Sequence, residues 1–239
     1  MRYSPRVSSH RAAARPHFPS RGSVPPPATR DTRFFPQKRA RDTHEKLLHS
    51  AAELFARRGF DDTQTPEIAE RAGVSVGTFY RYFSDKRQAF IELVQRELDA
   101  SYRRVMRDLT PETFSGARTA KDRRQAVDHV IELLFQNTAK NPRLHRVFMA
   151  VAMRDDAVAK IRDEFEERGR DALAALIRLL VPAERIPDAE AAAQVILVAA
   201  QDVALAVAGL RGPPPSPAQA EALRSALADM LYRYVFGEE

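Results

Sequence analysis

Three neighbouring residues, Gly73, Ser75 and Gly77, have the GxSxG spacing of the nucleophile elbow in α/β-hydrolases. A serine in that motif attacks an ester carbonyl when it lies between a buried strand and a helix, with an acid and a His later in the chain. His129 and His145 do follow. However, an alanine-rich helical pattern precedes the motif, and no β-branched run of strand length occurs upstream. The esterase interpretation therefore stays an alternative to a non-enzymatic function.

A second group, His44, Glu45 and His49, resembles the HExxH zinc signature but has the wrong spacing. The two His are five residues apart, which separates them by about 140° around a helix, so they cannot share one metal ion. We interpret them as solvated surface residues. The chain has no Cys, which excludes disulfides, thiolate zinc sites and cysteine nucleophiles. The sequence thus predicts no enzyme, metal or cofactor.

The sequence offers better evidence for a binding surface than for an active site. The residues concerned lie on a short helix that we expect from Ser75 to Tyr82. Gly73 supplies a turn with a left-handed backbone, and Ser75 is a natural N-cap. Phe79 and Phe83 lie four residues apart and should point into the core. This arrangement leaves the remaining side chains outside: Val76, Thr78, Tyr80, Arg81 and Tyr82.

These exposed residues suit nucleic acid. Tyrosines and threonines at a helix N-terminus can contact phosphates and base edges, and Gly77 allows close approach of the backbone. Lys86 is a cation in the first turn of the next helix, where the macrodipole is unfavourable to it although Asp85 offsets this. A phosphate partner would explain its presence. An ordinary solvated lysine is the alternative.

Two helices must hold this element in place. Asp42 and Glu45 fit a capping box at the start of an amphipathic helix over 43–58, which Gly59 ends. Its inward residues recur at helical spacing: Leu47, Leu48, Ala51, Leu54 and Phe55.

The second supporting helix should start at Thr65. A residue before a proline is pushed to extended geometry, so we predict that Thr65, before Pro66, is its N-cap. Its inward residues are Ile68, Ala69 and Ala72. Residues 63–83 therefore read as two short helices around a glycine turn, which is the layout of a helix-turn-helix.

Over residues 47–90, from LLHSAAELFARRGF through TQTPEIAERAGVSVGTFYRYFSDKRQAF, the chain resembles the TetR family of bacterial transcriptional regulators. The resemblance implies that Thr65 and Tyr82 hold phosphates of double-stranded DNA and that Lys86 clamps its backbone. It also implies which residues face the major groove: Ser75, Val76, Gly77, Thr78, Tyr80 and Arg81. Two positions depart from the family, which often has Lys in place of Val76 and an aromatic residue in place of Arg81, so base preference there stays open.

Charge divides the chain into two parts. Residues 1–40 carry nine Lys or Arg and one Asp, a net +8 against +6 for the whole chain, so the remainder carries −2. This segment also holds seven of the sixteen prolines and has no helical or strand period, so we predict a disordered tail. It would be either an arm that neutralises DNA phosphates or an unselected extension from a mis-assigned start.

The rest of the chain predicts an all-α fold of about nine helices. A long fourth helix should follow Lys86 and break at 110–116. Prolines and glycines then separate further helices over about 119–139, 142–154, 156–181, 187–210 and 216–236. We assign residues 41–88 to a helix-turn-helix domain and 89–239 to a ligand-binding and dimerisation domain.

One set of apolar residues in the second domain could line a ligand cavity, because it is rich in aromatic and adaptable side chains. Plain core packing is the alternative for each of them. The set is Leu134, Phe135, His145, Phe148, Met149, Met153 and Phe165.

The last two helices could form a dimer interface. Residues 189–210 are alanine-dense on several faces, and an apolar stripe follows the final helix: Leu223, Leu227, Met230, Leu231 and Tyr234. Two such helices from each of two subunits would make a four-helix interface, as in the TetR family. The alternative is an internal hairpin in a monomer.

The helix-turn-helix and the resemblance together predict a cytoplasmic homodimeric repressor. It would bind half-sites of a palindromic operator roughly 34 to 36 Å apart and would be released by a small-molecule inducer. No membrane partner is expected, because no uninterrupted apolar run or secretory signal is present. A sequence-tolerant architectural DNA-binding protein is the rival. Residues 41–86 hold seven Lys or Arg and eight acids, which argues against that rival.

Overall fold

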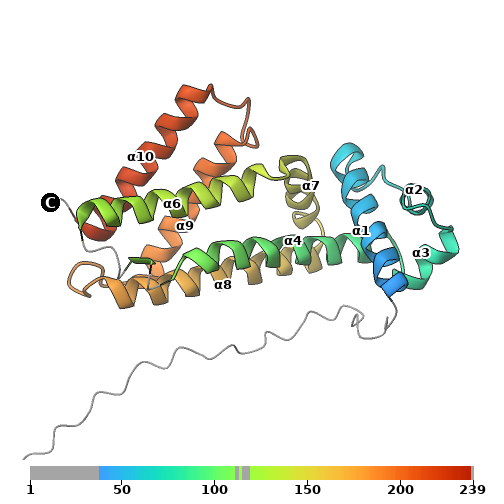
Figure 1. The fold of residues 1–239 in the computed structure, drawn as a ribbon, viewed down its shortest axis with the longest axis horizontal. Coiled ribbons are helices and arrows are strands. Elements are labelled where there is room, and N and C mark those ends of the chain that lie inside the picture. The colour runs from blue at the N-terminus through green and yellow to red at the C-terminus, as the bar shows by residue number, and fades with distance from the viewer. Residues whose placement is uncertain (1–37, 111–112, 115–118, 238–239) are drawn as a thin grey trace, which may run out of the picture.

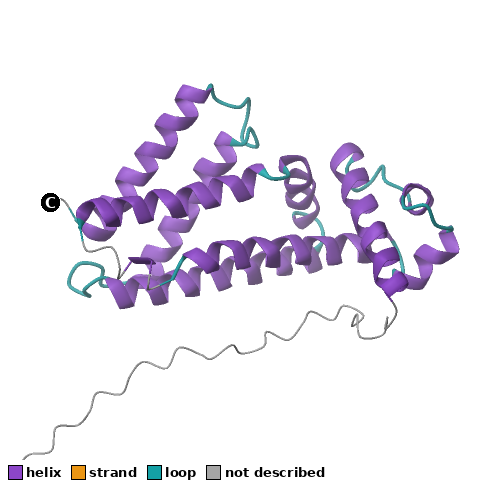
Figure 2. Cartoon of the chain, viewed as in Figure 1, coloured by secondary structure: helices purple, strands orange, loops and turns teal. Residues whose placement is uncertain are grey.

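The computed structural model describes residues 38–110, 113–114 and 119–237. Within these residues the chain forms nine helices and no strand, which confirms the predicted all-α fold (Figures 1 and 2). The helices are α1 (Lys38–Arg58), α2 (Thr65–Arg71), α3 (Val76–Tyr82), α4 (Lys86–Asp108), α6 (Ala120–Ala139), α7 (Pro142–Ala152), α8 (Asp156–Leu180), α9 (Ala189–Val207) and α10 (Pro217–Phe236).

Two of the predicted breaks have the expected backbone. Gly59 ends α1 with φ +85° and Gly73 separates α2 from α3 with φ +70°, a left-handed region that other residues rarely adopt. Pro142 and Pro217 begin α7 and α10, where a missing backbone N–H costs nothing.

The predicted start of the first helix was wrong. Helix α1 begins at Lys38, five residues before the predicted 43, so Asp42 lies inside the helix and caps nothing. One contact along this added turn is that of the Thr43 hydroxyl, which donates to the carbonyl of Arg39 at 2.9 Å. Residues 1–37 of the predicted tail lie outside the described residues.

The predicted cap of the second helix was also wrong, by one residue. Thr65 is already helical, and Gln64 is the N-cap with an extended backbone. The cause is a contact three residues along: the backbone N–H of Gln64 donates to Oε2 of Glu67 at 3.1 Å, which closes a capping box.

Helices α1, α2 and α3 with the first turns of α4 form a unit that we call the head. Its core is aromatic and fully buried at Phe55, Phe79, Phe83 and Phe90. The same apolar cluster continues into two later helices, through Leu144, Phe148 and Val151 of α7 and Val158 of α8. The head is therefore closed by residues about sixty positions downstream of it.

The remaining helices form the body, in which α4 and α8 run side by side from the head to the far end (Figure 1). Helices α6, α9 and α10 pack there around an alanine-dense core that includes Ala174, Ala192, Ala193 and Ala200. Among the described helices, α9 is long and apolar enough by composition to cross a membrane, with mean hydropathy 1.5 and 22% of the stretch buried. Core helices of water-soluble proteins pass the same test.

Candidate nucleic-acid interface

Helix α3 is fixed at its start by a side-chain cap. The hydroxyl Oγ of Ser75 accepts a hydrogen bond from the backbone N–H of Thr78 at 3.1 Å, and the two hydroxyls lie 2.9 Å apart. Ser75 has an extended backbone, as an N-cap requires. The predicted cap is confirmed, and it fixes the orientation of the Thr78 side chain as well.

The two sides of α3 differ sharply in burial. Phe79 and Phe83 are fully buried, as predicted from their spacing, and they hold the helix on the head core. The opposite side presents the surface that we call the reading face, which consists of Val76, Gly77, Thr78, Tyr80 and Arg81. Its apolar members are substantially exposed, at 38% for Val76 and 54% for Tyr80.

Tyr82 does not belong to this exposed set, and its predicted exposure was wrong. It is 8% exposed, because its ring packs on the imidazole of His44 with the centroids 5.7 Å apart. Helical spacing placed Tyr82 outside, but it could not show that α1 passes over this side of α3. The predicted phosphate contact of Tyr82 stays a prediction.

His44 itself was predicted on the surface and is buried. Its ring stacks on Phe83, with a centroid distance of 5.2 Å, and its Nε2 lies 3.1 Å from Oε1 of Glu92. Arg96 can only donate, and its Nη2 is 3.2 Å from Nδ1 of His44. Nδ1 therefore accepts and Nε2–H donates to Glu92, which links α1 to α4. His49 is on the surface, as predicted.

Lys86 has an internal role that the sequence did not indicate. Its ammonium donates to the backbone carbonyls of Phe60, Asp61 and Thr63 at 3.0, 2.8 and 2.8 Å, and it lies 5.0 Å from the centre of the Phe60 ring. An ammonium has three N–H donors, so the three carbonyls use all of them. The lysine holds the loop between α1 and α2 against the start of α4. A contact between Lys86 and DNA phosphate stays a prediction.

Two acidic residues of the head, Glu53 and Glu67, are paired with arginines of α1 and α2. Arg71 donates to Glu53 and Arg58 to Glu67, across α1 and α2. The hydrogen bond from Arg71 lowers the pKa of Glu53, and the backbone N–H of Gln64 together with Arg58 lowers the pKa of Glu67. These pairs neutralise two of the acidic side chains of α1 and α2 within the head.

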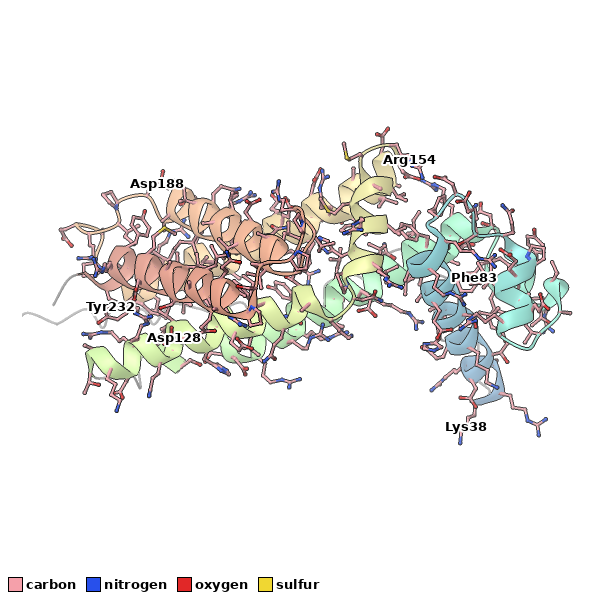
Figure 3. The ribbon with its side chains drawn as sticks, turned by 90° about the horizontal axis from the view of Figure 1, so that it is seen from above. Lys38, Phe83, Asp128, Arg154, Asp188 and Tyr232 are labelled. Atoms are coloured by element: carbon pink, nitrogen blue, oxygen red, sulfur yellow. The ribbon has the colours of Figure 1, made fainter. Side chains whose placement is uncertain are left out.

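Lys38 and Arg39, two of three cations at the start of α1, were missed as part of the ordered head. Lys38, Arg39 and Arg41 lie exposed on its first turns, and Figure 3 shows Lys38 at the free end of the helix. Cations at a helix N-terminus oppose the macrodipole, so the helix itself gives no reason for them. Their charge was visible in the sequence, but the prediction assigned residues up to 40 to a disordered tail.

The GxSxG spacing at 73–77 covers the turn between α2 and α3 and the first two residues of α3. Helix α2 ends at Arg71, so a helix occupies the place of the strand that a nucleophile elbow requires. The Ser75 hydroxyl is bonded within its own helix, to Thr78. His129 pairs with Asp108 at 3.2 Å, at the end of α4, and His145 lies in α7.

Ion pairs connect the body to the head at the turn between α7 and α8. Arg87 at the start of α4 donates to both carboxylate oxygens of Asp155, at 2.5 and 2.8 Å, and this hydrogen bonding lowers the pKa of Asp155. Arg154 donates to Asp61 of the head loop at 2.5 Å, and Figure 3 shows Arg154 at the head-facing end of the body. Both pairs connect residues more than sixty positions apart.

The predicted ligand set is dispersed in the structure. His145 and Phe148 line one cavity, between α4, α6 and α7. Met153 was wrongly predicted to line a cavity: it follows the last turn of α7 and is 85% exposed. The others are placed elsewhere: Leu134 and Phe135 in the body core, Met149 against the head core, and Phe165 half-buried on α8.

Comparison with known proteins agrees with this architecture. Residues 47–93 match the family model described as bacterial regulatory proteins, tetR family, and residues 122–234 match the tetracyclin repressor-like C-terminal domain. A transcriptional regulator from Rhodococcus sp. Rha1 superposes with a TM-score of 0.60 and 22% identity, over 80% of this chain and 95% of that one.

Two curated relatives differ in how much of them the chain covers. The HTH-type transcriptional repressor BepR of Brucella suis is 30% identical over 66% of this chain and 77% of its own length. The HTH-type transcriptional activator FasR of Mycolicibacterium smegmatis is 34% identical, but only over 38% of this chain and 37% of its own length. The matches to both halves of the chain, together with the repressor aligned over most of its length, show that this chain belongs to the TetR family of bacterial transcriptional regulators.

Proposed function

We propose that this regulator is a homodimeric repressor that binds a palindromic operator in the cytoplasm and is released by a small molecule. The observation that carries DNA recognition is the reading face of α3, whose exposed side chains are backed by the fully buried Phe79 and Phe83. Repression is favoured over activation because the repressor BepR aligns over twice as much of its length as the activator FasR.

In this proposal the reading face enters the major groove. Tyr80 and Arg81 reach base edges or phosphates, and Val76 can touch a thymine methyl. Phosphate contacts come from Thr65 and from three exposed cations at the start of α1: Lys38, Arg39 and Arg41. Ser75 faces the major groove with the reading face. A phosphate contact of Tyr82 requires its ring to leave the contact with His44, and one of Lys86 requires it to exchange a loop carbonyl for the phosphate. Lys38 and Arg39 change the charge of the head from −1 over residues 41–86 to +1 over residues 38–86, which favours a polyanion.

Dimerisation is proposed through the apolar face of α9 and α10, which consists of Val195, Val198, Leu223, Met230 and Tyr234. These side chains are 40 to 62% exposed in a single chain. Exposed apolar side chains on two helices in contact are typical of an interface, and the stretch of α9 that is only 22% buried would be covered there. A second copy with the same face gives a two-fold four-helix interface that matches a palindromic site.

We propose that ligand binding in the body changes the position of the head through α7 and so releases the DNA. The helix contributes Leu144 and Phe148 to the head core, and the turn after it holds the head by two ion pairs. A ligand changes DNA occupancy only by binding the two states with different affinity. To move occupancy from about 99:1 to 1:99, this preference must be about 10⁴-fold.

Selection of binding sites from a random pool of duplex DNA tests the proposal. We expect an enriched inverted repeat, and we expect Tyr80→Ala and Arg81→Gln to change which repeat is enriched. Arg143→Gln, on an exposed position of α7, is the matched control and should select the wild-type sequence. A pool that stays random after binding would support the architectural rival. An enriched site with only one half would count against the dimer.

A further inference from the structure

The cavity between α4, α6 and α7 combines an apolar wall with a polar one. Its apolar wall consists of Val94, Leu98, Leu144 and Phe148, which belong to the head core or pack against it. The polar wall includes Arg104, Asn137 and His145. A pocket with one mainly apolar side and a few convergent polar groups is the usual form of a small-molecule site.

Two polar atoms of this wall are buried and have no partner among the described residues: Nδ2 of Asn137 and Nε2 of His145. Burying such a group without a hydrogen bond costs about 1–3 kcal/mol. The amide of Asn137 is oriented, because its Oδ1 accepts from Nε of Arg104 at 2.6 Å. Its NH2 group is therefore a donor that needs an acceptor.

The charge of the cavity is also unbalanced. Lys140 and Glu97 both line it, and their charged atoms lie 3.4 Å apart, so they offset each other. Arg104 remains. Within the described part of the chain its terminal nitrogens Nη1 and Nη2 have no ion-pair or hydrogen-bond partner. Burial lowers the pKa of His145, so the imidazole adds no charge at neutral pH.

We propose that this cavity binds a small carboxylate, with its oxygens on Arg104 and Asn137 and its carbon atoms on the apolar wall. Arg104 offers the fork of donors that pairs with a carboxylate, and Asn137 adds a neutral donor beside it. The inference rests on the proposed function, since it names the chemical class of the small molecule that releases the DNA.

The volume of the cavity limits the number of carbon atoms that the bound carboxylate can have. Its volume is about 110 Å³. A cavity of roughly 150 Å³ holds one benzene, so a compact ligand of about six non-hydrogen atoms with its carboxylate at the open side is the right scale. The unpartnered atoms of Asn137 and His145 lie just beneath the cavity surface. A ligand reaches them when their side chains or helices shift, and α7 carries such a shift toward the head.

Four probes with one isopropyl group and different polar ends test this chemistry: isobutyrate, isobutyramide, isobutanol and isobutylammonium. Their methyl signals allow the same saturation-transfer NMR measurement on the full-length protein at neutral pH. We expect isobutyrate to bind most tightly, isobutyramide and isobutanol more weakly, and isobutylammonium not at all. Binding of isobutylammonium as tight as that of isobutyrate, or no binding of isobutyrate, overturns the proposal.

Variants assign the contacts. Arg104→Gln should weaken isobutyrate about tenfold or more while changing isobutyramide little. Asn137→Asp keeps the shape of the side chain and its bond to Arg104, and it should abolish isobutyrate binding by repulsion. Arg103→Gln removes the same charge from an exposed neighbouring position of α4 and should bind as the wild type does. Unchanged isobutyrate affinity in both Arg104→Gln and Asn137→Asp refutes the assignment.

Failure of this inference is distinguishable from failure of the proposed function. Operator binding is measured separately by mobility shift, with and without isobutyrate. If isobutyrate binds in the NMR measurement and the operator affinity stays unchanged, the carboxylate site stands and ligand-controlled release is refuted. If isobutyrate does not bind and the protein still binds its operator, the site is refuted and DNA recognition stands.

Discussion

The head and the body bury their apolar residues in different ways. Every one of the largest fully buried side chains among the described residues belongs to the head and the residues that close it, including Phe55, Phe79, Phe83 and Phe90. The body core combines many alanines with larger apolar residues, and outside that core large apolar side chains of α9 and α10, such as Val195 and Met230, are about half exposed or more. The head thus buries its large apolar side chains completely, whereas the body leaves several of its own exposed.

This difference suits two tasks. A recognition helix must keep its side chains within a fraction of an ångström of the DNA, and interlocked aromatic rings give that rigidity. A subunit that pairs with a second copy and admits a ligand needs an uncovered apolar face and unfilled space. Four measurements test this difference between the head and the body.

The largest effect is expected from Phe90→Ala in the head. Phe90 is fully buried and meets the rings of Phe55 and Phe60 at centroid distances of 5.1 Å, so its removal leaves a cavity. The free energy of unfolding, measured by urea titration, should fall by about 3–5 kcal/mol. Tyr80→Ala, on the exposed side of α3, should change it by under about 0.5 kcal/mol. A loss below about 1 kcal/mol for Phe90→Ala would mean that the head core tolerates the removal of a large side chain, and it would contradict the rigidity that we assign to the head.

Met230→Glu should act on assembly instead of folding. A charge placed in an apolar interface without a partner costs about 3 kcal/mol or more, which is a weakening of the dimer by at least about 100-fold. Light scattering should then report a monomer at micromolar concentration, with helical content retained by circular dichroism. Leu179→Glu alters a similarly exposed apolar residue of α8, outside α9 and α10, and should leave the mass unchanged. A dimer in both variants would contradict the proposed interface.

Lys86→Met separates the two roles of this lysine. It leaves three loop carbonyls without their donor, so the free energy of unfolding should fall by about 2 kcal/mol and DNA binding should weaken at all sequences. Lys46→Met, on an exposed position of α1, is the control. If the lysine also contacts a phosphate, the slope of log affinity against log salt falls by about one. An unchanged slope with weakened binding assigns the lysine to the loop alone.

The smallest effect concerns pH. Burial lowers the pKa of His145 below the ordinary value of 6.5 for a histidine, and Glu97, Arg104 and Lys140 line the same cavity. Below that value the unfolded chain binds a proton that the folded protein resists, so the free energy of unfolding should decrease as the pH falls. The difference between pH 7.5 and 5.5 should be smaller in His145→Gln than in the wild type, and unchanged in the exposed His49→Gln. An equal difference in all three would show that His145 is not kept neutral by burial.

Much of the fold followed from local signals in the sequence. Gly59, Gly73, Pro142 and Pro217 end or begin helices for reasons of backbone geometry that need no distant partner. The spacing of Phe79 and Phe83 was enough to separate the buried side of α3 from most of its reading face.

The errors concern contacts between distant segments. His44 and Tyr82 are buried because α1 crosses α3, and periodicity within one helix carries no such information. Lys86 reaches carbonyls 23 to 26 residues before it, which no spacing rule anticipates. The cavity residue Arg104 went unnoticed for the same reason, because its partner Asn137 lies on another helix.

The closure of the head core by α7 and α8 has a consequence for how the protein is made. The ribosome synthesises α1 to α4 before Phe148, Val151 and Val158. During synthesis, part of the apolar surface of the head is therefore uncovered until these residues follow. A chain that stops after α4 lacks these residues altogether. A fragment that ends after α4 would leave the apolar surface under Phe148, Val151 and Val158 exposed to water, so we expect the isolated head to be less stable than the head within the whole chain.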